Sequence, residues 1–417
     1  MAHAAPAELA RKAPGFREFV AMVATLMAMT ALAIDAMLPA LPAIGEALNV
    51  VEDNDRQLVI GALLLGFGLA QIVHGPLSDR FGRRPLLVGG LGLYALSSVV
   101  AAFAQSFELL LAARFAQGIA VAATRVLAIS IVRDLYVGRK MAQVMSFAMM
   151  VFMAVPVLAP LFGEIILSVA SWRWIFWMFA GIGIGVGLWI GWRLPETLQP
   201  EDRLPLTPRR VARGWKHTLT DRKSLGYMLA SALLSGALFG FINSIQQVMY
   251  DTFDRPDMLV PAFALIAGAM SAASLLNSRI VLRLGTRLVS HSALLVFIGL
   301  AVASTVIAWS DSKSLWLFLI LLSANMGAFG LCGANFSAMA MEEMGAIAGT
   351  ASSVQGAVGV LFGAIIGGAI GQMYDGTTLP LSLGFLLCSL VALGCVFVTE
   401  RGRLFYEDEL ADDPARA

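Results

Sequence analysis

The chain has 417 residues, of which 58% are apolar and 14% are charged. Its 29 Lys and Arg nearly balance its 28 Asp and Glu, so it lacks the strongly basic surface on which nucleic-acid binding depends, and we expect no nucleic-acid partner. The apolar fraction exceeds the roughly 45–50% of soluble domains, which indicates a membrane protein.

Long apolar blocks recur along the whole chain. At about 1.5 Å per helical residue, each is long enough to cross a hydrocarbon core of about 30 Å. In lipid, the backbone groups of each block must pair within the block itself, which favours helices. We therefore predict an all-α membrane protein with twelve transmembrane helices. The predicted spans are residues 17–40, 57–74, 85–104, 108–132, 141–167, 174–192, 224–250, 259–282, 288–309, 315–340, 346–372 and 381–399.

Basic residues lie mostly on one side of the predicted spans. The two termini and the connections at 75–85, 133–140 and 193–223 carry most of the Lys and Arg, whereas each alternate connection carries one at most. Positively charged connections stay in the cytoplasm. We therefore predict a multi-pass membrane protein with both termini in the cytoplasm.

A long polar connection separates six spans from six. The segment RFGRR at 80–84 recurs as RLGTR at 283–287, each between the second and third spans of its half. This repeat predicts two pseudo-symmetric six-helix halves, a plan that transporters use to build a substrate site between the halves. The predicted divisions are an N-terminal half at 1–192, a cytoplasmic linker at 193–223, a C-terminal half at 224–400 and a cytoplasmic tail at 401–417.

The segment GPLSDRFGRRP at 75–85 joins two apolar blocks through a sharp turn. Glycine permits such a turn, and arginine holds the loop in the cytoplasm. Neither requirement explains Asp79, which we expect to pair with Arg83 one turn later or with a helix N-terminus. The other candidate residues of this loop are Gly75, Arg80, Gly82 and Arg84.

Four segments resemble one known family. GPLSDRFGRRP resembles the signature loop of the major facilitator superfamily, and RFAQGIAVAATRVLAISIVRD at 114–134 is similar to the proton-antiporter motif of its drug-exporter branch. AIDAMLPALPAIGEAL at 33–48 resembles the first-helix signature of the Bcr/CflA-type multidrug efflux group. AVPVLAPLFGEIILSVASWRWIFW at 154–177 resembles the fifth-helix antiporter motif of that group.

The resemblance implies the major facilitator fold and a cytoplasmic gate. Asp79 would face the N-terminus of the eleventh helix near Gly349, and Arg83 would meet Asp134 at the end of the fourth helix. The gate residues would be Gly75, Asp79, Arg80, Gly82, Arg83, Arg84 and Asp134. The fifth-helix antiporter motif would be carried by Pro156, Pro160 and Gly163.

Few charged residues lie at membrane depth, where each costs about 2.5–3.5 kcal/mol or more on insertion scales. Asp35 lies in the outer half of the first span, and Arg114 lies at a similar depth in the fourth. Gln117 shares a helix face with Arg114. Asp35 and Arg114 either form a structural ion pair or serve proton coupling, with Asp35 as the proton carrier. The resemblance implies proton coupling for the first-helix acid and for the fourth-helix Arg and Gln.

Arg125 follows Arg114 by eleven residues, close to three helical turns, so the two share a face. The resembling group usually has a small residue here and a basic one near position 129, which is Ile129 in this chain. Arg125 is therefore either a second substrate contact or a charge that reaches the cytoplasmic mouth.

Neutral polar side chains at membrane depth complete the candidate substrate cavity. Each either hydrogen-bonds between helices or lines the cavity. The cavity candidates are Asp35, Arg114, Arg125, Asn243, Gln247, Asn325 and Asn335.

The sequence has no nucleophile–base cluster, metal-ligand cluster or P-loop, so we predict no enzyme activity, no metal and no cofactor. With the resemblance to the Bcr/CflA-type group, we predict a monomeric proton-coupled antiporter of the bacterial inner membrane that exports small amphipathic drugs or toxic compounds by alternating access. Export of a native metabolite such as an amino acid, dipeptide or siderophore is the main alternative. A membrane receptor without transport activity is a further one.

Overall fold

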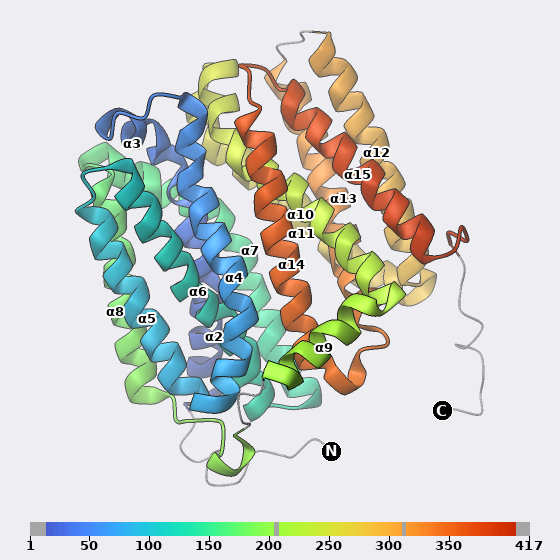
Figure 1. Cartoon of the computed structure of the whole chain (residues 1–417). Coiled ribbons are helices and arrows are strands. Elements are labelled where there is room, and N and C mark those ends of the chain that lie inside the picture. The colour runs from blue at the N-terminus through green and yellow to red at the C-terminus, as the bar shows by residue number, and fades with distance from the viewer. Residues whose placement is uncertain (1–13, 204–207, 311–313, 406–417) are drawn as a thin grey trace.

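The structure, a computed structural model, describes residues 14–203, 208–310 and 314–405. Every regular element in these ranges is a helix (Figure 1). Twelve of the described helical segments are long and apolar enough to cross a membrane, which confirms the predicted fold class and number of spans. The helices of these segments are α2 (Phe16–Asp35), α4 (Leu58–Phe81), α5 (Arg83–Ala102), α6 (Phe107–Leu135), α7 (Gly138–Val169), α8 (Arg173–Arg193), α10 (Arg222–Gln247), α11 (Leu259–Leu284), α12 (Thr286–Trp309), α13 (Leu315–Met341), α14 (Ala348–Gln372) and α15 (Leu379–Thr399).

The first predicted span is interrupted near its C-terminal end. Helix α2 stops at Asp35, a short 3-10 turn covers Leu38–Ala40, and α3 continues over Leu41–Ala47. Pro39 and Pro42 explain the interruption, because proline has no N–H to donate and its ring clashes with the preceding turn. The last carbonyl groups of α2 are therefore left without partners in their own helix.

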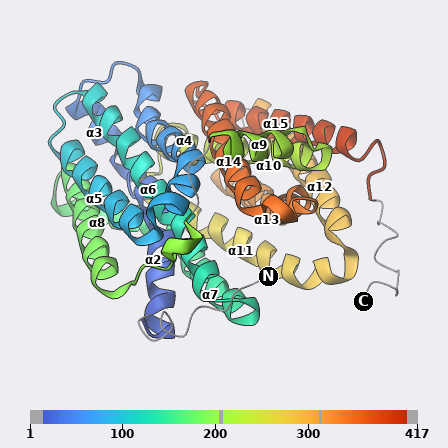
Figure 2. The same cartoon turned by 60° about the horizontal axis from the view of Figure 1, so that its bottom comes forward.

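The spans from α2 to α8 pack on one another in one half of the molecule, and those from α10 to α15 pack on one another in the other half (Figures 1 and 2). Between the halves, α4 lies along α14, and α7 contacts α11. Each contact thus joins the second span of one half to the fifth span of the other. Such reciprocal pairing is what a two-fold relation between the halves produces.

The repeated loops have the same backbone feature in both halves. Gly82, between α4 and α5, has φ of +103°, and Gly285, between α11 and α12, has φ of +76°. Residues with a Cβ rarely adopt positive φ. Glycine in both copies of the repeat is therefore explained by the turn that each loop must make.

The connection between the halves contains a helix that the sequence did not predict, α9 (Pro208–Thr220). It packs against α10 and α14. A Cβ placed on Gly214 of α9 would lie 2.7 Å from the side chain of Thr350 in α14. The end of the bundle that carries α9 is called the linker end below, and the opposite end is called the far end.

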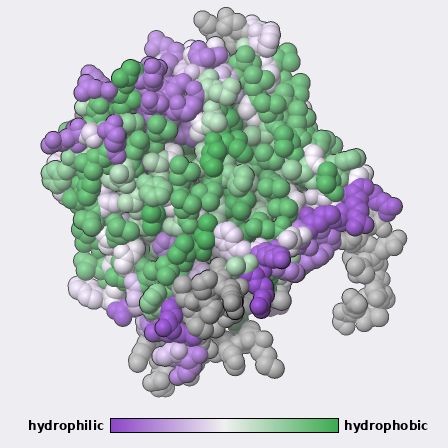
Figure 3. Space-filling view, viewed as in Figure 1, coloured by the Kyte–Doolittle hydropathy of each residue, from purple (hydrophilic) through white to green (hydrophobic). Residues whose placement is uncertain are grey.

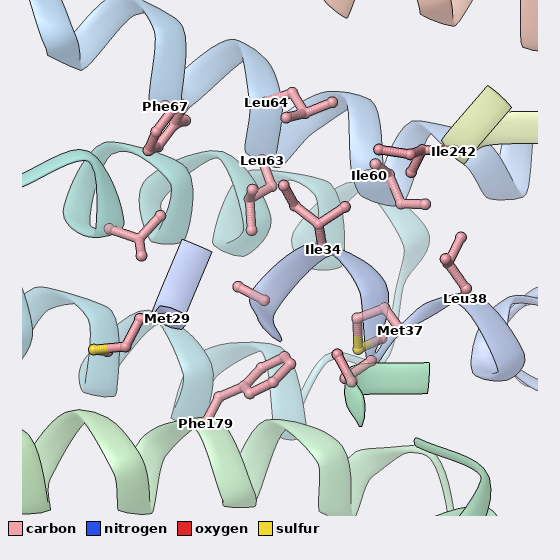
Figure 4. Close-up of a cluster of buried hydrophobic side chains, with 14 of the residues drawn as sticks. Met29, Ile34, Met37, Leu38, Ile60, Leu63, Leu64, Phe67, Phe179 and Ile242 are labelled. Carbon is pink, nitrogen blue, oxygen red and sulfur yellow. The ribbon is translucent and has the colours of Figure 1, made fainter. Parts of the chain in front are cut away.

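The face of the molecule seen in Figure 3 is apolar in its middle and polar toward its ends. Large aromatic side chains project at the borders, among them Trp192 with 84% of its area exposed and Trp309 with 77%. Tryptophan favours the boundary between lipid and water. Inside the first half, Ile34 of α2, Leu63 and Phe67 of α4 and Phe179 of α8 belong to one buried cluster (Figure 4).

Candidate functional site

A cavity of about 740 Å³ lies between the two halves. Helices α2, α4, α6 and α7 of the first half line it, together with α10, α11, α13 and α14 of the second. Toward the linker end its wall reaches Met341, the last residue of α13, and Ser352 in the first turns of α14. The size and the mixed, largely apolar wall are typical of small-molecule sites. The aromatic side chains of the wall are Phe67, Phe152, Phe239, Phe241, Phe263 and Phe329.

Asp35 lies in this wall, at the position where α2 ends. The residue is only 4% exposed. Among the residues that the structure describes, none forms a hydrogen bond or ion pair with its carboxylate. A charged carboxylate without a partner is costly in apolar surroundings, so a proton or a cationic group is needed to neutralise it.

Arg114 is fully buried behind the wall, which corrects the prediction that it lines the cavity. Its Nη2 donates to the carbonyl oxygen of Ala33 at 2.8 Å, and its Nε donates to that of Val59 at 3.1 Å. The Ala33 carbonyl is one of the groups left free where α2 ends, and a cation is stabilised at a helix C-terminus. Arg114 therefore supports the backbone that carries Asp35 and does not contact its carboxylate.

Gln117 lies beside Arg114 and outside the cavity. Its Oε1 accepts from Arg114 Nη1 at 2.5 Å, and its Nε2 donates to Ser98 Oγ at 2.7 Å. Gln117 thus connects the arginine of α6 to helix α5.

Arg125 occupies the wall, as predicted, with its side chain exposed to the cavity. No other described residue makes an ion pair or hydrogen bond with its guanidinium. Arg114 and Arg125 share a face of α6, but Arg114 lies behind the cavity wall and Arg125 lies in it.

The four amides predicted for the cavity in the second half lie elsewhere, each at most 3% exposed. Asn243 and Asn325 donate to carbonyl oxygens one turn earlier in their own helices. Asn335 does the same and also bonds to Asn277, which joins α13 to α11. Gln247 belongs to the far-end contacts described below. These residues serve as contacts within and between helices, the alternative use that the sequence left open.

Three wall residues were not predicted. Gln71 of α4 and Gln355 of α14 each have a buried Nε2, and Thr30 of α2 has a buried Oγ1, without a hydrogen-bond partner in the described structure. A lone amide in an apolar run, such as LAQIV around Gln71, is the signal that could have identified them. Buried polar groups are usually paired, so these atoms mark where a ligand can bind.

At the far end of the bundle, neutral side chains from both halves bond to one another. They are here called the amide clasp: Asn54, Gln57, Gln247 and Gln372. Gln57 Nε2 donates to Gln247 Oε1 and, at 3.2 Å, to the Gly371 carbonyl. Gln247 Nε2 donates to Asn54 Oδ1 at 2.8 Å. Gln372 Nε2 donates to the Asn54 carbonyl at 2.8 Å, and Asn54 Nδ2 donates to the Gln372 carbonyl at 3.0 Å.

The predicted gate loop lies at the linker end and centres on Arg83, which is 4% exposed. Its Nη1 donates to Asp79 Oδ1 at 2.6 Å, and its Nε donates to Asp134 Oδ2 at 3.2 Å. Asp134 also accepts from Thr197 Oγ1 at 2.9 Å. Both carboxylates and Arg83 belong to the first half, so these bonds hold that half together at its linker end.

Of the remaining gate residues, some contact other helices and some face solvent. Arg80 is exposed, and Arg84 donates to the Gly191 carbonyl. A Cβ on Gly75 would lie 3.3 Å from Ser353 Oγ of α14, so α4 and α14 are close here.

The contact predicted near Gly349 involves a different residue. A Cβ placed on Gly349 would lie 3.7 Å from Arg133 Nη1, and Asp79 does not come within 4 Å of it. Asp79 turns instead to Arg83, as the other sequence interpretation expected.

The antiporter-motif residues lie on α7. The helix continues through Pro156 and Pro160, and Pro156 lines the cavity. Each proline removes one backbone hydrogen bond. A Cβ on Gly163 would lie 2.3 Å from the Ala36 carbonyl oxygen, so glycine is required where α7 passes the end of α2.

Comparisons with known proteins agree with this architecture. The family model described as "Major Facilitator Superfamily" matches residues 22–368. The bicyclomycin resistance protein homolog of Haemophilus influenzae is 29% identical over 385 residues, 92% of this chain and 96% of that protein. The chloramphenicol resistance protein of Pseudomonas aeruginosa is 29% identical over 378 residues, 88% of this chain and 87% of that protein.

A solved structure shows the same fold. The xylose transporter XylE from E. coli, in a partially occluded inward-open conformation, superposes with a TM-score of 0.71 at 13% identity, covering 93% of this chain and 98% of that one. The family match spans most of the described helices, and the relatives support the predicted Bcr/CflA resemblance. The chain therefore belongs to the Major Facilitator Superfamily and is a membrane transporter.

Proposed function

We propose that this protein is a proton-coupled antiporter that exports small amphipathic compounds by alternating access. The observation that carries the proposal is the unpartnered Asp35 in the wall of a cavity between two halves. A proton and a cationic or polar group of the cargo can occupy this carboxylate in turn. Competition for one site couples the two movements in opposite directions.

The distribution of basic residues supports an orientation in which the linker end faces the cytoplasm. The linker end carries the loop at 75–85 and the connection at 193–223, which are rich in arginine, so it corresponds to the cytoplasm of a bacterial inner-membrane protein. The described conformation then has its far end closed toward the periplasm by the amide clasp. The cavity extends toward the cytoplasm, where cargo is loaded, and the transporting unit is a monomer.

The relatives favour toxic compounds as cargo. Their names refer to resistance to bicyclomycin and chloramphenicol. An apolar wall with a few adaptable polar groups suits varied amphipathic molecules. Export of a native metabolite would use the same machinery.

The test is proton flux in proteoliposomes that contain the full-length protein and a pH-sensitive dye. Chloramphenicol and bicyclomycin are added under an imposed pH gradient, and compound-dependent proton movement is expected. Asp35→Asn cannot exchange a proton and is expected to lower this flux at least about a hundredfold, the lower end of proton-transfer contributions.

Asp375→Asn is the matched control, because this carboxylate is exposed in a far-end loop and bonds only locally to Thr377. It is expected to behave as the unaltered protein. Uphill, proton-driven export that persists in the Asp35→Asn protein would refute the proposal.

A further inference from the structure

The cavity wall contains one acidic and one basic residue among the described residues that line it. Asp35 extends from α2 and Arg125 from α6. Within the described chain, neither charge has an ion-pair or hydrogen-bond partner. Two unpaired opposite charges in an otherwise neutral wall each need a counter-charge, and a bound molecule can supply both.

The two charges do not pair with each other because they lie at different heights. Helices α2 and α6 run in opposite directions, and Arg114 is level with the end of α2 because it bonds to the Ala33 carbonyl. Arg125 lies eleven residues further along α6, about 16 Å at 1.5 Å per residue. After the reach of both side chains, carboxylate and guanidinium are separated by on the order of 10 Å.

We propose that the cavity binds an elongated zwitterion, whose amine pairs with Asp35 and whose carboxylate pairs with Arg125. This inference rests on the proposed antiport and names its cargo class. An extended peptide covers about 3.3–3.6 Å per residue, so about three residues span the gap. A free amino acid carries both charges on one carbon and is too short to reach both residues.

Neutral groups of the wall fit the middle of such a molecule. Gln71 and Gln355 lie on facing helices, and the Nε2 of each is a buried donor without a partner. Peptide carbonyl groups between the two charged ends are the acceptors that these amides need. The phenylalanines of the wall accommodate apolar side chains.

The sign of coupling favours a zwitterion over a singly charged cargo. The cargo amine competes with a proton for Asp35, so loading the cargo releases the proton, as antiport requires. An organic anion at Arg125 would leave Asp35 protonated, so its loading would release no proton. A simple cation at Asp35 would release the proton but leave Arg125 unpaired, whereas a molecule with both charges releases the proton and pairs with both residues.

The test uses three matched probes: the tripeptide Phe-Ala-Phe, its C-terminal amide and its N-acetyl form. Binding to the purified full-length protein is measured by isothermal titration calorimetry. The free tripeptide is expected to bind at least about tenfold more tightly than either capped form, the factor typical of one hydrogen-bonded charge pair.

Two substitutions assign the two ends. Arg125→Gln should reduce the affinity for the free tripeptide to that for its amide, while the affinity for the amide stays unchanged. Asp35→Asn should reduce it to the affinity of the N-acetyl form. Arg139→Gln, at an exposed arginine at the start of α7, is the matched control and should change neither affinity.

The inference is overturned if the unaltered protein binds none of the three peptides or binds them equally. It is also overturned if Arg125→Gln weakens the amide as much as the free peptide. In either case, proton flux driven by chloramphenicol would leave the proposed antiport standing. The loss of proton flux with both chloramphenicol and the peptides would remove the proposed function as well.

Discussion

The far end and the linker end of the bundle are held by different chemistry. At the far end, neutral amides of the clasp bond across the two halves. At the linker end, each half has a charged cluster of its own. The first cluster is Arg83 with Asp79 and Asp134, and the second is Arg287 with Glu342 and Glu400.

This difference in chemistry corresponds to a difference in the free energy needed to break the two kinds of contact. A neutral hydrogen bond contributes about 0.5–1.5 kcal/mol net because water replaces it. Breaking a buried charge pair by removing one partner costs about 3–5 kcal/mol. In the proposed alternating access, neutral bonds between the halves would let the far end open, and charged bonds inside each half would keep that half rigid.

The largest expected effect is at the linker end of the first half. Arg83→Ala removes the partner of two carboxylates and leaves like charges facing each other. We expect the free energy of unfolding to fall by about 2–4 kcal/mol, less than for a fully buried pair, because the Asp79 side chain is 38% exposed. Denaturant unfolding in detergent measures this loss.

The control is Arg139→Ala, at an exposed arginine, which should change the free energy of unfolding by no more than about 0.5 kcal/mol. High salt should reduce the difference between the two variants, because it screens charge pairs. Equal stabilities for both variants would show that the cluster does not hold the first half together.

A smaller effect is expected from Gln57→Ala in the amide clasp. The change removes the bonds to Gln247 and to the Gly371 carbonyl. We expect the equilibrium between closed and open far ends to shift by about 1–2 kcal/mol toward the open form. Spin labels at Glu52 and Asp375, one in each half, would report the larger separation in a background without the three native cysteines.

Gln199→Ala, in the connection at the linker end, serves as the control and should leave the distance distribution unchanged. If Gln57→Ala also leaves it unchanged, other contacts close the far end.

The smallest effect concerns the charged cluster of the second half and depends on pH. Glu400 lies just beyond α15. Burial opposes its charge, but hydrogen bonds from Tyr227 and Arg287 outweigh burial and hold the pKa of this carboxyl below its usual value. A lowered pKa in the folded state contributes stability above the pKa of the unfolded chain, near 4.3, and this stability is lost as the pH falls through the folded pKa.

Glu400→Gln is therefore expected to lower the free energy of unfolding by about 1 kcal/mol at pH 7, and the difference should be smaller at about pH 3, because it shrinks as the pH falls below about 4.3. Thermal unfolding at both pH values measures it. Glu201→Gln, at an exposed carboxylate in the linker, should show no such dependence. A difference that grows on acidification would contradict the assignment.

The sequence predicted the spans well because lipid acts on whole segments, and length and hydropathy are visible in the chain. It predicted the cavity wall less well, because which face of a helix is covered depends on the neighbouring helices. Arg114 and Arg125 share a helix face, yet the end of α2 covers Arg114 and leaves Arg125 in the cavity.

Contacts between distant segments were also missed. Asn54 falls in the predicted connection before the second span, and Gln57 is the first residue of that span, and neither was predicted to make a contact between the halves. Asn54 bonds to Gln372, which lies 318 positions away along the chain. Gln57 bonds to Gln247, which lies 190 positions away. Helix α9 was missed because its polar composition and Pro208 are typical of a linker.

Both unpaired charges of the cavity wall lie on helices of the first half, α2 and α6, so the two halves contribute different chemistry to the wall. The second half contributes phenylalanines, serines and one glutamine to the wall, but no ionisable side chain among its described residues. Its wall can therefore diversify during evolution and change which molecules are accepted, while the half that carries Asp35 and Arg125 stays intact. Variation in cargo range among close relatives should accordingly be concentrated on α10, α11, α13 and α14.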